Sequence, residues 1–383
     1  MFFSRMFSYR TLPVILISFF LAGLPYNGAA QMITTSSEKI RIVEVIRGLE
    51  HPWGMAFLPD GRILVTERPG RLRLVENGQL VPKPVSGLPT IVAQGQGGLL
   101  DVALHPRFAE NQLVYIAYTS ARERGISTDV ARAKLVGAEL EDVQVIFRGN
   151  RGTTTGRHFG SRLVFDGKGF LYIGLGDHGQ MDRAQDSADH AGSVIRIHDD
   201  GRIPADNPYQ QQSDWLPEIY SIGNRNVQGA ALHPVSGELW THEHGPQGGD
   251  EINIIRAGRN YGWPVITYGV NYGIGTRIGI GTHKDGMEQP LYQWTPSIAP
   301  SGMTFYSGDT FPNWHGDLFV GALRGQMLVR LTLEGEQVVA EERMLQNQVG
   351  RIRDVRQGPD GFIYLLTDAR NGALLRLEPA VSM

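Results

Sequence analysis

The chain has 383 residues, with 36 Lys and Arg against 39 Asp and Glu, a formal charge of -3 and no cysteine. The lack of cysteine excludes a disulfide framework, a thiolate metal site and a cysteine nucleophile. The near balance of charge argues against a nucleic-acid partner or a broad anionic-membrane surface. The 48 glycines exceed the average share of roughly 7% without a collagen-like period, which predicts many tight turns and many short strands.

Residues 1–30 have the pattern of a secretory signal peptide. Two arginines precede an apolar run from Leu12 to Leu24, and small residues lead to Ala30. A membrane anchor is the alternative, but the run has about 13 residues, short of the roughly 20 that a membrane-spanning helix needs. We therefore expect cleavage near Ala30, export to a bacterial periplasm and no membrane span in the mature chain.

A turn followed by a β-rich run occurs six times along the mature chain. The runs are Arg62–Val65, Leu113–Ile116, Phe170–Ile173, Glu238–Trp240, Asp317–Val320 and Phe362–Leu365. Several follow an apolar segment and an Asp-Gly type of turn, which is the pattern of a β-hairpin. Their spacing equals or exceeds the about 40–50 residues of a four-stranded propeller blade.

We therefore predict that residues 31–383 form a single all-β domain, a six-bladed β-propeller with four-stranded antiparallel blades. A pair of β-sandwiches is the alternative, but it would not predict six similar hairpins. No amphipathic helix of four turns is visible, and Gly262 to Trp294 is predicted to be a long loop. Loops of that length in a compact fold are usually functional.

His158 and Asp177 are candidates for acid–base chemistry. His158 directly precedes one predicted strand, and Asp177 follows the next strand along the chain. A hairpin could place the carboxylate beside the imidazole, which could then act as a general base. A structural histidine on the surface or in a hydrogen bond is the alternative.

Arginines are placed where they could form an anion pocket. Arg225 and Asn226 precede an apolar strand, and Arg324 follows the end of another. Arg351 and Arg353 alternate along a predicted strand, so both should point to one face. Because arginine binds carboxylates through two hydrogen bonds, the set could hold a polyanion. Solvated surface arginines would fit the same pattern.

A third candidate is a metal site in His242–Pro246 and Gly248–Glu251. The two histidines are spaced i, i+2, which differs from the i, i+4 spacing of helical zinc sites. Two carboxylates with carbonyl groups in a glycine-rich segment suit a hard cation such as calcium better. An ordinary turn would have the same composition.

Taken together, these segments resemble the soluble pyrroloquinoline quinone (PQQ)-dependent aldose sugar dehydrogenases, relatives of soluble quinoprotein glucose dehydrogenase. The resemblance extends from His51 to Leu377. The segments that carry it are His51–Trp53, Gly95–Val102, Arg157–Gly160, Arg162–Gly167, Gly223–Asn226, Glu243–Pro246, Gly249–Asn253, Asn260–Pro264 and Arg351–Val355.

The resemblance implies PQQ as the cofactor, whose carboxylates would explain an arginine pocket. The implied PQQ-binding positions are Gln96, Arg225, Asn226, Tyr272, Ala322, Leu323, Arg324, Arg351, Ile352 and Arg353. It also implies His158 as the general base, Asp177 as its orienting partner and Arg225 as a second catalytic residue. Arg324 stands where the family usually has lysine, and a planar fork differs from a point charge.

Calcium is the second implied cofactor. The resemblance places one ion, in contact with PQQ, at the backbone carbonyls of Gly245 and Pro246. It places a separate structural ion at the Glu251 side chain and the Tyr261 backbone.

The implied reaction is the oxidation of an aldose at C1 to an aldonolactone, with hydride transfer to PQQ while His158 removes the hydroxyl proton. Calcium would act as a Lewis acid, and Arg225 would stabilise developing negative charge. The electron acceptor is unidentified, and both a monomer and a homodimer remain open.

Two alternative functions, a hydrolase and a non-catalytic binding protein, remain open. A calcium-dependent propeller lactonase or hydrolase would use the histidine and carboxylates, but it needs no arginine pocket. A non-catalytic propeller that binds a sugar or a partner would not need a His–Asp pair beside that pocket.

Overall fold

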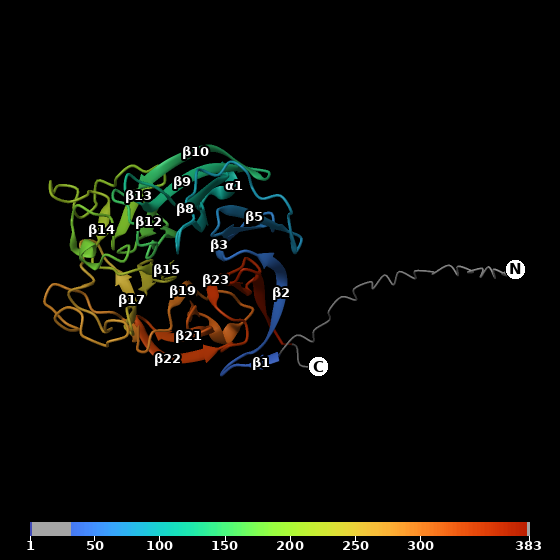
Figure 1. Ribbon diagram of the computed structural model, residues 1–383. Coiled ribbons are helices and arrows are strands. Elements are labelled where there is room, and N and C mark those ends of the chain that lie inside the picture. Colours follow the sequence, from blue (N-terminus) through green and yellow to red (C-terminus); the bar gives the residue numbers. More distant parts are fainter. Residues whose placement is uncertain (2–31, 381–383) are drawn as a thin grey trace.

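The computed structural model describes Met1 and residues 32–380, and these form a ring of β-sheets (Figure 1). The expected signal peptide and its cleavage near Ala30 lie outside the described residues. Every pairing between the named strands is antiparallel, and six separate sheets surround one centre. The six-bladed β-propeller predicted from the hairpin repeats is confirmed.

The first three blades follow one another along the chain. Blade 1 contains β3 (Pro52–Phe57), β4 (Ile63–Glu67), β5 (Arg71–Glu76) and β6 (Gln79–Leu80). Blade 2 contains β7 (Leu99–Leu104), β8 (Leu113–Ala121), β9 (Ile126–Val136) and β10 (Glu139–Arg148). Blade 3 contains β11 (Arg162–Phe165), β12 (Phe170–Gly174), β13 (Val194–His198) and β14 (Ile219–Ser221).

The other three blades complete the ring. Blade 4 contains β15 (Val227–Leu232), β16 (Leu239–Glu243), β17 (Asp250–Ile255) and β18 (Tyr292–Trp294). Blade 5 contains β19 (Pro300–Phe305), β20 (Leu318–Ala322), β21 (Met327–Glu334) and β22 (Gln337–Met344). Blade 6 contains β23 (Ile352–Gln357), β24 (Ile363–Thr367), β25 (Gly372–Pro379), β2 (Lys39–Leu49) and β1 (Met32–Thr34).

The six β-rich runs of the sequence fall on the second strand of each blade. The preceding turns contain glycines with positive φ, as at Gly61 (87°) and Gly361 (79°), a conformation that costs a glycine little. The long loop expected between Gly262 and Trp294 joins β17 to β18, and its last three residues are strand β18.

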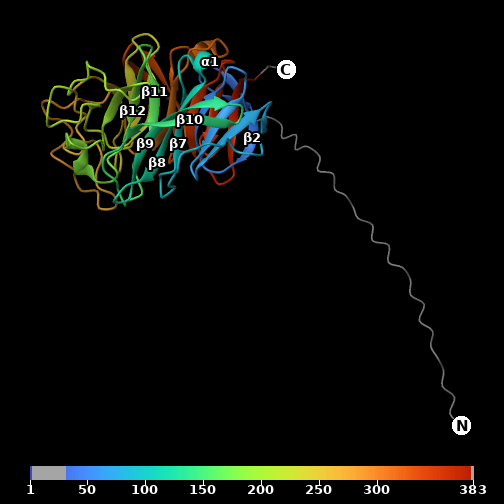
Figure 2. The same cartoon turned by 90° about the horizontal axis from the view of Figure 1, so that it is seen from above.

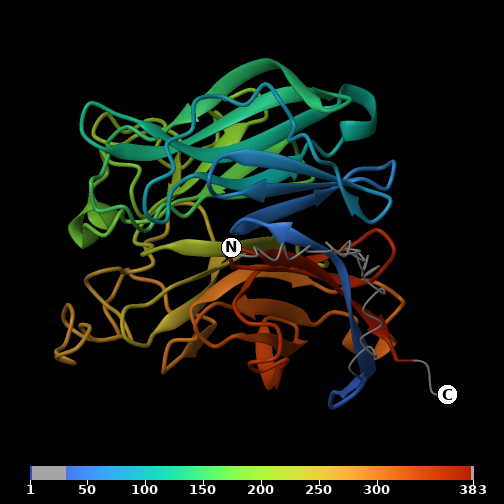
Figure 3. The same ribbon diagram turned by 45° about the vertical axis from the view of Figure 1, so that its right-hand side comes forward.

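Blade 6 departs from the four-stranded expectation because its sheet has five strands, in the order β1-β2-β25-β24-β23. The N-terminal strand β2 pairs with β25 near the C-terminus, for example Ile42 with Leu377, and Figure 3 shows the two side by side. The two ends of the described chain therefore close the ring together, which removes two exposed sheet edges.

The helices are short and lie in the connections between the strands of the blades. They are α1 (Phe108–Asn111), the 3-10 helix η1 (Met181–Gln185) and the 3-10 helix η2 (Pro312–Trp314). None of the helical segments in the described ranges has the length and hydrophobicity that crossing a bilayer requires.

The hydrophobic core is divided among the blade interfaces. Six clusters of buried side chains each join two neighbouring blades, such as Leu64 and Leu99 between blades 1 and 2 or Trp240 and Leu318 between blades 4 and 5. Each sheet thus buries both faces against its neighbours.

The first strand of each blade lies nearest the centre, where it contacts the first strands of both neighbours. A buried ionic cluster crosses this centre: Arg162 lies 3.2 Å from Asp101 and 3.0 Å from Asp354. Arg356 contacts the same two carboxylates at 3.2 Å each. Seen at right angles, long loops of blades 3 and 4, in green and yellow, extend beyond the strands (Figure 2).

Candidate active site

A cavity of about 270 Å³ opens at the centre of the ring. All six blades or their connecting loops contribute to its wall. The lining residues are Trp53, Arg68, Gln96, Leu100, Phe159, Gly160, Asn226, Gln228, His244, Ala299, Leu323, Arg351 and Arg353. Residues that are far apart in the sequence therefore meet here, as expected for a propeller.

His158 and Asp177 lie beside this cavity in direct contact. His158 precedes β11 and Asp177 follows β12, and these strands pair with Arg162 opposite Gly174, so the two chain ends come together. The Nδ1 atom of His158 lies 2.6 Å from Oδ1 of Asp177. A proton on Nδ1 leaves Nε2 as the basic nitrogen.

The backbone of His158 supports this arrangement. Its φ angle is 58°, a region that non-glycine residues seldom adopt. Its N–H donates to Oε1 of Gln96 at 2.8 Å, and its carbonyl accepts from the N–H of His178 at 3.2 Å. A strained backbone held by its neighbours is often found at functional sites.

Burial governs the protonation of the pair. Burial lowers the pKa of His158 below its ordinary value of 6.5, although the hydrogen bond to Asp177 opposes the change. Burial alone would raise the pKa of Asp177, but the hydrogen bond and charge of His158 outweigh it and lower that pKa. At neutral pH the pair is therefore a neutral imidazole beside a carboxylate.

Arg225 and Asn226 are held by one buried carboxylate. The backbone N–H groups of both residues donate to Oε2 of Glu243. The Arg225 guanidinium donates to the carbonyl oxygens of His244 (3.0 Å) and Gly245 (2.8 Å), while its buried Nε atom has no partner among the described residues. Within the described chain, the guanidinium group of Arg225 therefore has carbonyl oxygens, not a carboxylate, as its hydrogen-bond acceptors.

Arg351 and Arg353 extend from β23 and its preceding loop to the same face, as their alternation predicts. Both donate to Oδ2 of Asp368, at 3.2 and 3.0 Å. Arg353 also donates to Oε1 of Gln228 at 3.1 Å, and Arg351 to the carbonyl of Leu323 at 3.4 Å. One carboxylate thus accepts hydrogen bonds from two guanidinium groups. Because one negative charge faces two positive charges, this part of the cavity wall keeps a net positive charge.

Of the other predicted cofactor positions, some line the cavity or are buried near it, and two are exposed outside it. Gln96 and Leu323 line the cavity, and Ala322 and Ile352 are buried at the ends of β20 and β23 behind it. Arg324 is exposed and Tyr272 is 64% exposed. Neither of the last two is part of the cavity wall as it stands.

Three of the four predicted calcium positions line a second, much smaller space, whereas Pro246 is not part of its lining. A cavity of about 10 Å³ is lined by Gly245, Glu251 and Tyr261, together with Glu243 and other residues, and it is large enough for about one water molecule. Within the described residues, no three His, Asp or Glu side chains are grouped closely enough to hold a metal ion. A cation here would therefore depend on backbone carbonyl oxygens as well.

The two histidines of the segment His242–Pro246 do not line the small cavity together: His242 is buried in the core, and His244 also lines the central cavity. His242 is fully buried, neither of its ring nitrogens has a hydrogen-bond partner within residues 32–380, and burial lowers its pKa to about 3. Nε2 of His244 lies 2.6 Å from the carbonyl oxygen of Pro300. His242 therefore acts as part of the core, whereas His244 forms part of the wall of the central cavity.

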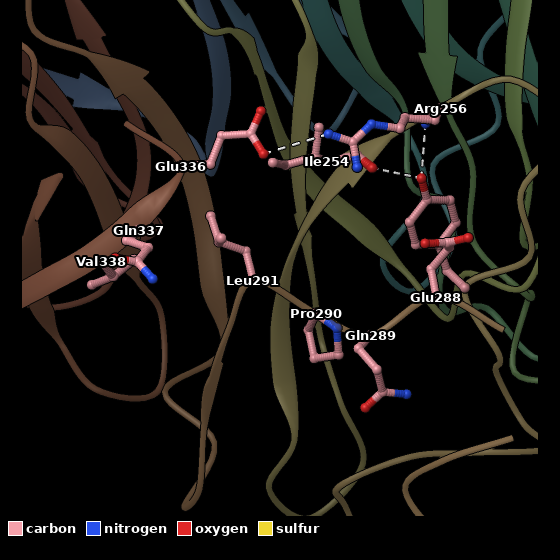
Figure 4. Close-up of a pocket in the computed structure, with 10 residues that line it drawn as sticks. Ile254, Arg256, Glu288, Gln289, Pro290, Leu291, Glu336, Gln337 and Val338 are labelled. Atoms are coloured by element: carbon pink, nitrogen blue, oxygen red, sulfur yellow. Dashed lines mark hydrogen bonds and ion pairs between the residues drawn. The ribbon is translucent and has the colours of Figure 1, made fainter. Parts of the chain in front are cut away.

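A hollow of about 600 Å³ between blades 4 and 5 has a different chemistry (Figure 4). Its arginine, Arg256, is paired with Glu238 at 3.1 Å and Glu336 at 3.5 Å. Because that charge is already neutralised, the hollow offers no free cation for an acidic ligand. The central cavity is the better candidate for the active site.

The comparison with known families agrees with this geometry. The sequence profile described as glucose / sorbosone dehydrogenase matches residues 49–376. The chain belongs to this family. The resemblance inferred from the sequence segments is thereby confirmed.

Relatives within the glucose/sorbosone dehydrogenase family align over nearly the whole chain. Aldose sugar dehydrogenase YliI of Escherichia coli (strain K12) is 43% identical over 367 residues, covering 94% of this chain and 98% of the relative. The apo-form crystal structure of the soluble aldose sugar dehydrogenase from Escherichia coli has a TM-score of 0.87 at 44% identity, covering 89% of this chain and 100% of that one. The PQQ-bound aldose sugar dehydrogenase of Streptomyces coelicolor has a TM-score of 0.71 at 29% identity, covering 91% and 98%.

The buried charges of this family member suit an acidic cofactor. The buried Nε atoms of Arg225 and Arg353 have no hydrogen-bond partner in the part of the chain that the structure describes, and unpaired buried polar atoms are costly. A ligand with several carboxylates would supply the missing acceptors and balance the excess positive charge. The donor set therefore fits PQQ.

Three residues of the site were not predicted from the sequence: Asp368, Glu243 as the partner of Arg225, and Trp263. Nε1–H of Trp263 donates to Oδ2 of Asp177 at 2.8 Å. Trp263 stands in a segment that carries the family resemblance, which was an available signal. Asp368 directly follows β24, which pairs with β23, so the hairpin brings it to Arg351 and Arg353; this strand-end position was also an available signal.

Proposed function

We propose that this chain is a PQQ-dependent aldose sugar dehydrogenase that oxidises aldoses at C1 to aldonolactones. The observation that carries the proposal is a cationic cavity at the ring centre beside a buried, hydrogen-bonded His–Asp pair. The family membership supports the same activity class.

Residues on the cavity wall would hold the cofactor. Arg351 and Arg353 would contact its carboxylates, with Gln96 and Asn226 as neutral hydrogen-bonding groups. Arg225 lines the small cavity and contacts the wall residue His244, so it would reach the cofactor from beside the wall. Arg324 and Tyr272 would join the site from the exposed loops at the cavity mouth. When bound, PQQ would supply the acceptor for the hydride that leaves C1 of the sugar.

The chain's own groups would move the proton and balance the charge. Nε2 of His158 would take the proton from the C1 hydroxyl, so the sugar would lose one hydride and one proton. Asp177 would hold the Nδ1 proton in place and stabilise the imidazolium that forms. The Arg225 guanidinium would stabilise negative charge that develops on oxygen.

Calcium would bind at two places. The carbonyl oxygen of Gly245 accepts from Arg225 but has a second lone pair, so Gly245 and Pro246 could hold a cation beside the cofactor. Glu251 and the Tyr261 backbone would hold a structural ion. A hard cation bound at the first place would act as a Lewis acid.

The proposed setting follows from the N-terminal pattern. Residues 1–30 would be removed on export, and residues 31–383 would act in the periplasm as one catalytic domain. The electron acceptor would be a separate molecule, and the enzyme would be a monomer or a homodimer.

A direct test uses purified protein without its export segment. Dye reduction with glucose is measured before and after adding PQQ and calcium, alongside a PQQ binding titration. We expect saturable PQQ binding and reduction that starts only after the addition. Arg353→Ala should weaken PQQ binding, whereas Arg202→Ala, at a side chain that is 72% exposed in an outer turn, should not.

Two outcomes would overturn the proposal. Folded protein that takes up no PQQ in the presence of calcium would remove the cofactor assignment. Hydrolysis of lactones or esters without PQQ, with no sugar oxidation, would favour the lactonase instead.

A further inference from the structure

Trp263 lies between blades although it belongs to the long loop of blade 4. Its backbone N–H donates to the carbonyl of Gly223 at 2.9 Å, and its carbonyl accepts from Nε2 of Gln185 at 2.7 Å. Its ring packs with the buried side chains of Ala184 and Ile278, and the residue is 6% exposed. Gly223 and Gln185 at blade 3 therefore fix the backbone of Trp263, and Ala184 and Ile278 pack beside its side chain.

The indole contacts both charged partners of the proposed proton transfer. Nε1–H donates to Oδ2 of Asp177 at 2.8 Å, and the guanidinium carbon of Arg225 lies 5.2 Å from the ring centroid. That second distance is within the range of a cation–π interaction. One side chain thus touches the partner of His158 and the catalytic arginine.

We infer that Trp263 is a positioning residue of this site, which orients Asp177 toward His158 and fixes the place of Arg225. The inference rests on the proposed function, because it assigns the indole a role in that reaction. The contacts of the indole with the site are to Asp177 and Arg225, so it acts through these two residues.

The hydrogen bonds of Asp177 show why the indole N–H matters. Oδ1 accepts from Nδ1 of His158 at 2.6 Å and from the backbone N–H of Gly179 at 2.6 Å, while Oδ2 accepts from Trp263. With both oxygens bonded, the carboxylate cannot rotate without losing a partner. That orientation keeps the proton on Nδ1 and the lone pair on Nε2 of His158.

The test separates the N–H group from the packing of the ring. Trp263→Phe removes the donor and keeps an aromatic ring. Trp240→Phe is the matched control, because Trp240 is fully buried in blade 4 and its Nε1 atom has no hydrogen-bond partner. For both variants, kcat with PQQ and calcium is measured against pH, and the His158 imidazole is titrated by NMR in the PQQ-free protein.

We expect Trp263→Phe to lower kcat by roughly 10-fold to 100-fold, the range for losing a hydrogen bond to a charged group. The titration midpoint of His158 should move to higher pH, because Asp177 without its indole donor is a stronger acceptor for the imidazolium. The other charged or titratable groups near the pair, Arg157, Arg225 and His178, are unchanged. Trp240→Phe should keep the wild-type rate and midpoint.

A Trp263→Phe enzyme with the rate and midpoint of Trp240→Phe would overturn the inference. If the Trp263→Phe variant does not fold, a measurement on the wild-type protein can still test the inference. The indole N–H resonance of Trp263 should shift with the same midpoint as His158, and that of Trp240 should not. A Trp263 resonance that stays constant through the His158 titration would also overturn the inference.

A separate measurement, on the wild-type protein with PQQ and calcium, tests the proposed function. If the wild-type protein with PQQ and calcium oxidises no aldose, the proposed function is overturned, whatever the NMR titration of the PQQ-free protein shows.

Discussion

Glu243 and Glu251 face each other as directly paired residues of the antiparallel strands β16 and β17. Burial raises the pKa of Glu243 to about 7. Burial and the neighbouring Glu243 carboxylate raise the pKa of Glu251 well above its ordinary value. Like charges directly opposite on a sheet are destabilising. A cation bound between the two carboxylates would reduce the free-energy cost of ionising both.

Calcium should therefore stabilise the protein even without PQQ. At a calcium concentration of 100 times Kd, the expected gain in the free energy of unfolding is about 2.7 kcal/mol. Thermal unfolding in calcium and in chelator measures it. Glu251→Gln should raise the Tm of the calcium-free protein, because it removes an acidic group whose ionisation burial and Glu243 disfavour, and it should reduce the gain from calcium.

Glu336→Gln is the control for this experiment, since Glu336 is a half-exposed carboxylate that pairs with Arg256 in the outer hollow. It should leave the calcium response unchanged. An equal calcium response in Glu251→Gln and wild type would show that Glu251 is not a ligand.

His158→Asn should abolish most turnover and leave PQQ binding intact. The change keeps a polar side chain of similar size but removes the basic nitrogen, and general-base catalysis is worth roughly 10²–10⁴ in rate. Dye reduction gives kcat, and a PQQ titration gives the affinity. A variant within tenfold of the wild-type rate would exclude His158 as the base.

The pH dependence of kcat should show an acid limb below pH 6.5. His158 can accept a proton only when neutral, and burial lowers its pKa from the ordinary value of 6.5. Activity should therefore be complete at neutral pH and fall as the pH drops through that lowered pKa. The exposed histidine variant His315→Gln should have the same profile, whereas a wild-type midpoint at or above 6.5 would contradict the assignment.

Asp368→Asn should destabilise the protein at neutral pH. Burial alone would raise the pKa of Asp368, but Arg353, His51 and Arg351 together lower it well below its ordinary range. A group with a lowered folded-state pKa stabilises above its unfolded pKa, and the stabilisation disappears as the pH falls through the folded value. The expected loss is about 1.5–3 kcal/mol at pH 7.

Urea unfolding of wild type and Asp368→Asn between pH 7 and pH 3 measures this difference, which should narrow below pH about 4. Asp60→Asn removes an exposed pair with Arg62 and should cost at most about 1 kcal/mol. A difference for Asp368→Asn that does not change with pH would show that the ion pairs are not its source.

Much of the fold follows from the sequence because a hairpin is a local structure. Turns such as Pro59–Gly61 and Pro359–Gly361 set two strands beside each other within a dozen residues, and six such units indicate six blades. The fifth strand of blade 6 was not predicted, because β2 pairs with β25 across almost the whole chain and no local pattern records that pairing.

The sequence by itself determined which residue types were available for the site: an imidazole before one strand, a carboxylate after the next, and alternating arginines. The tertiary structure alone decided their partners. Asp368 meets Arg351 and Arg353 once β23 and β24 pair within blade 6. Trp263 reaches Asp177 only after the blade 4 loop has packed against blade 3. Hydrogen bonds act over about 3 Å, so a bond between residues far apart in the chain, such as that of Trp263 to Asp177, depends on how their two neighbouring blades pack together.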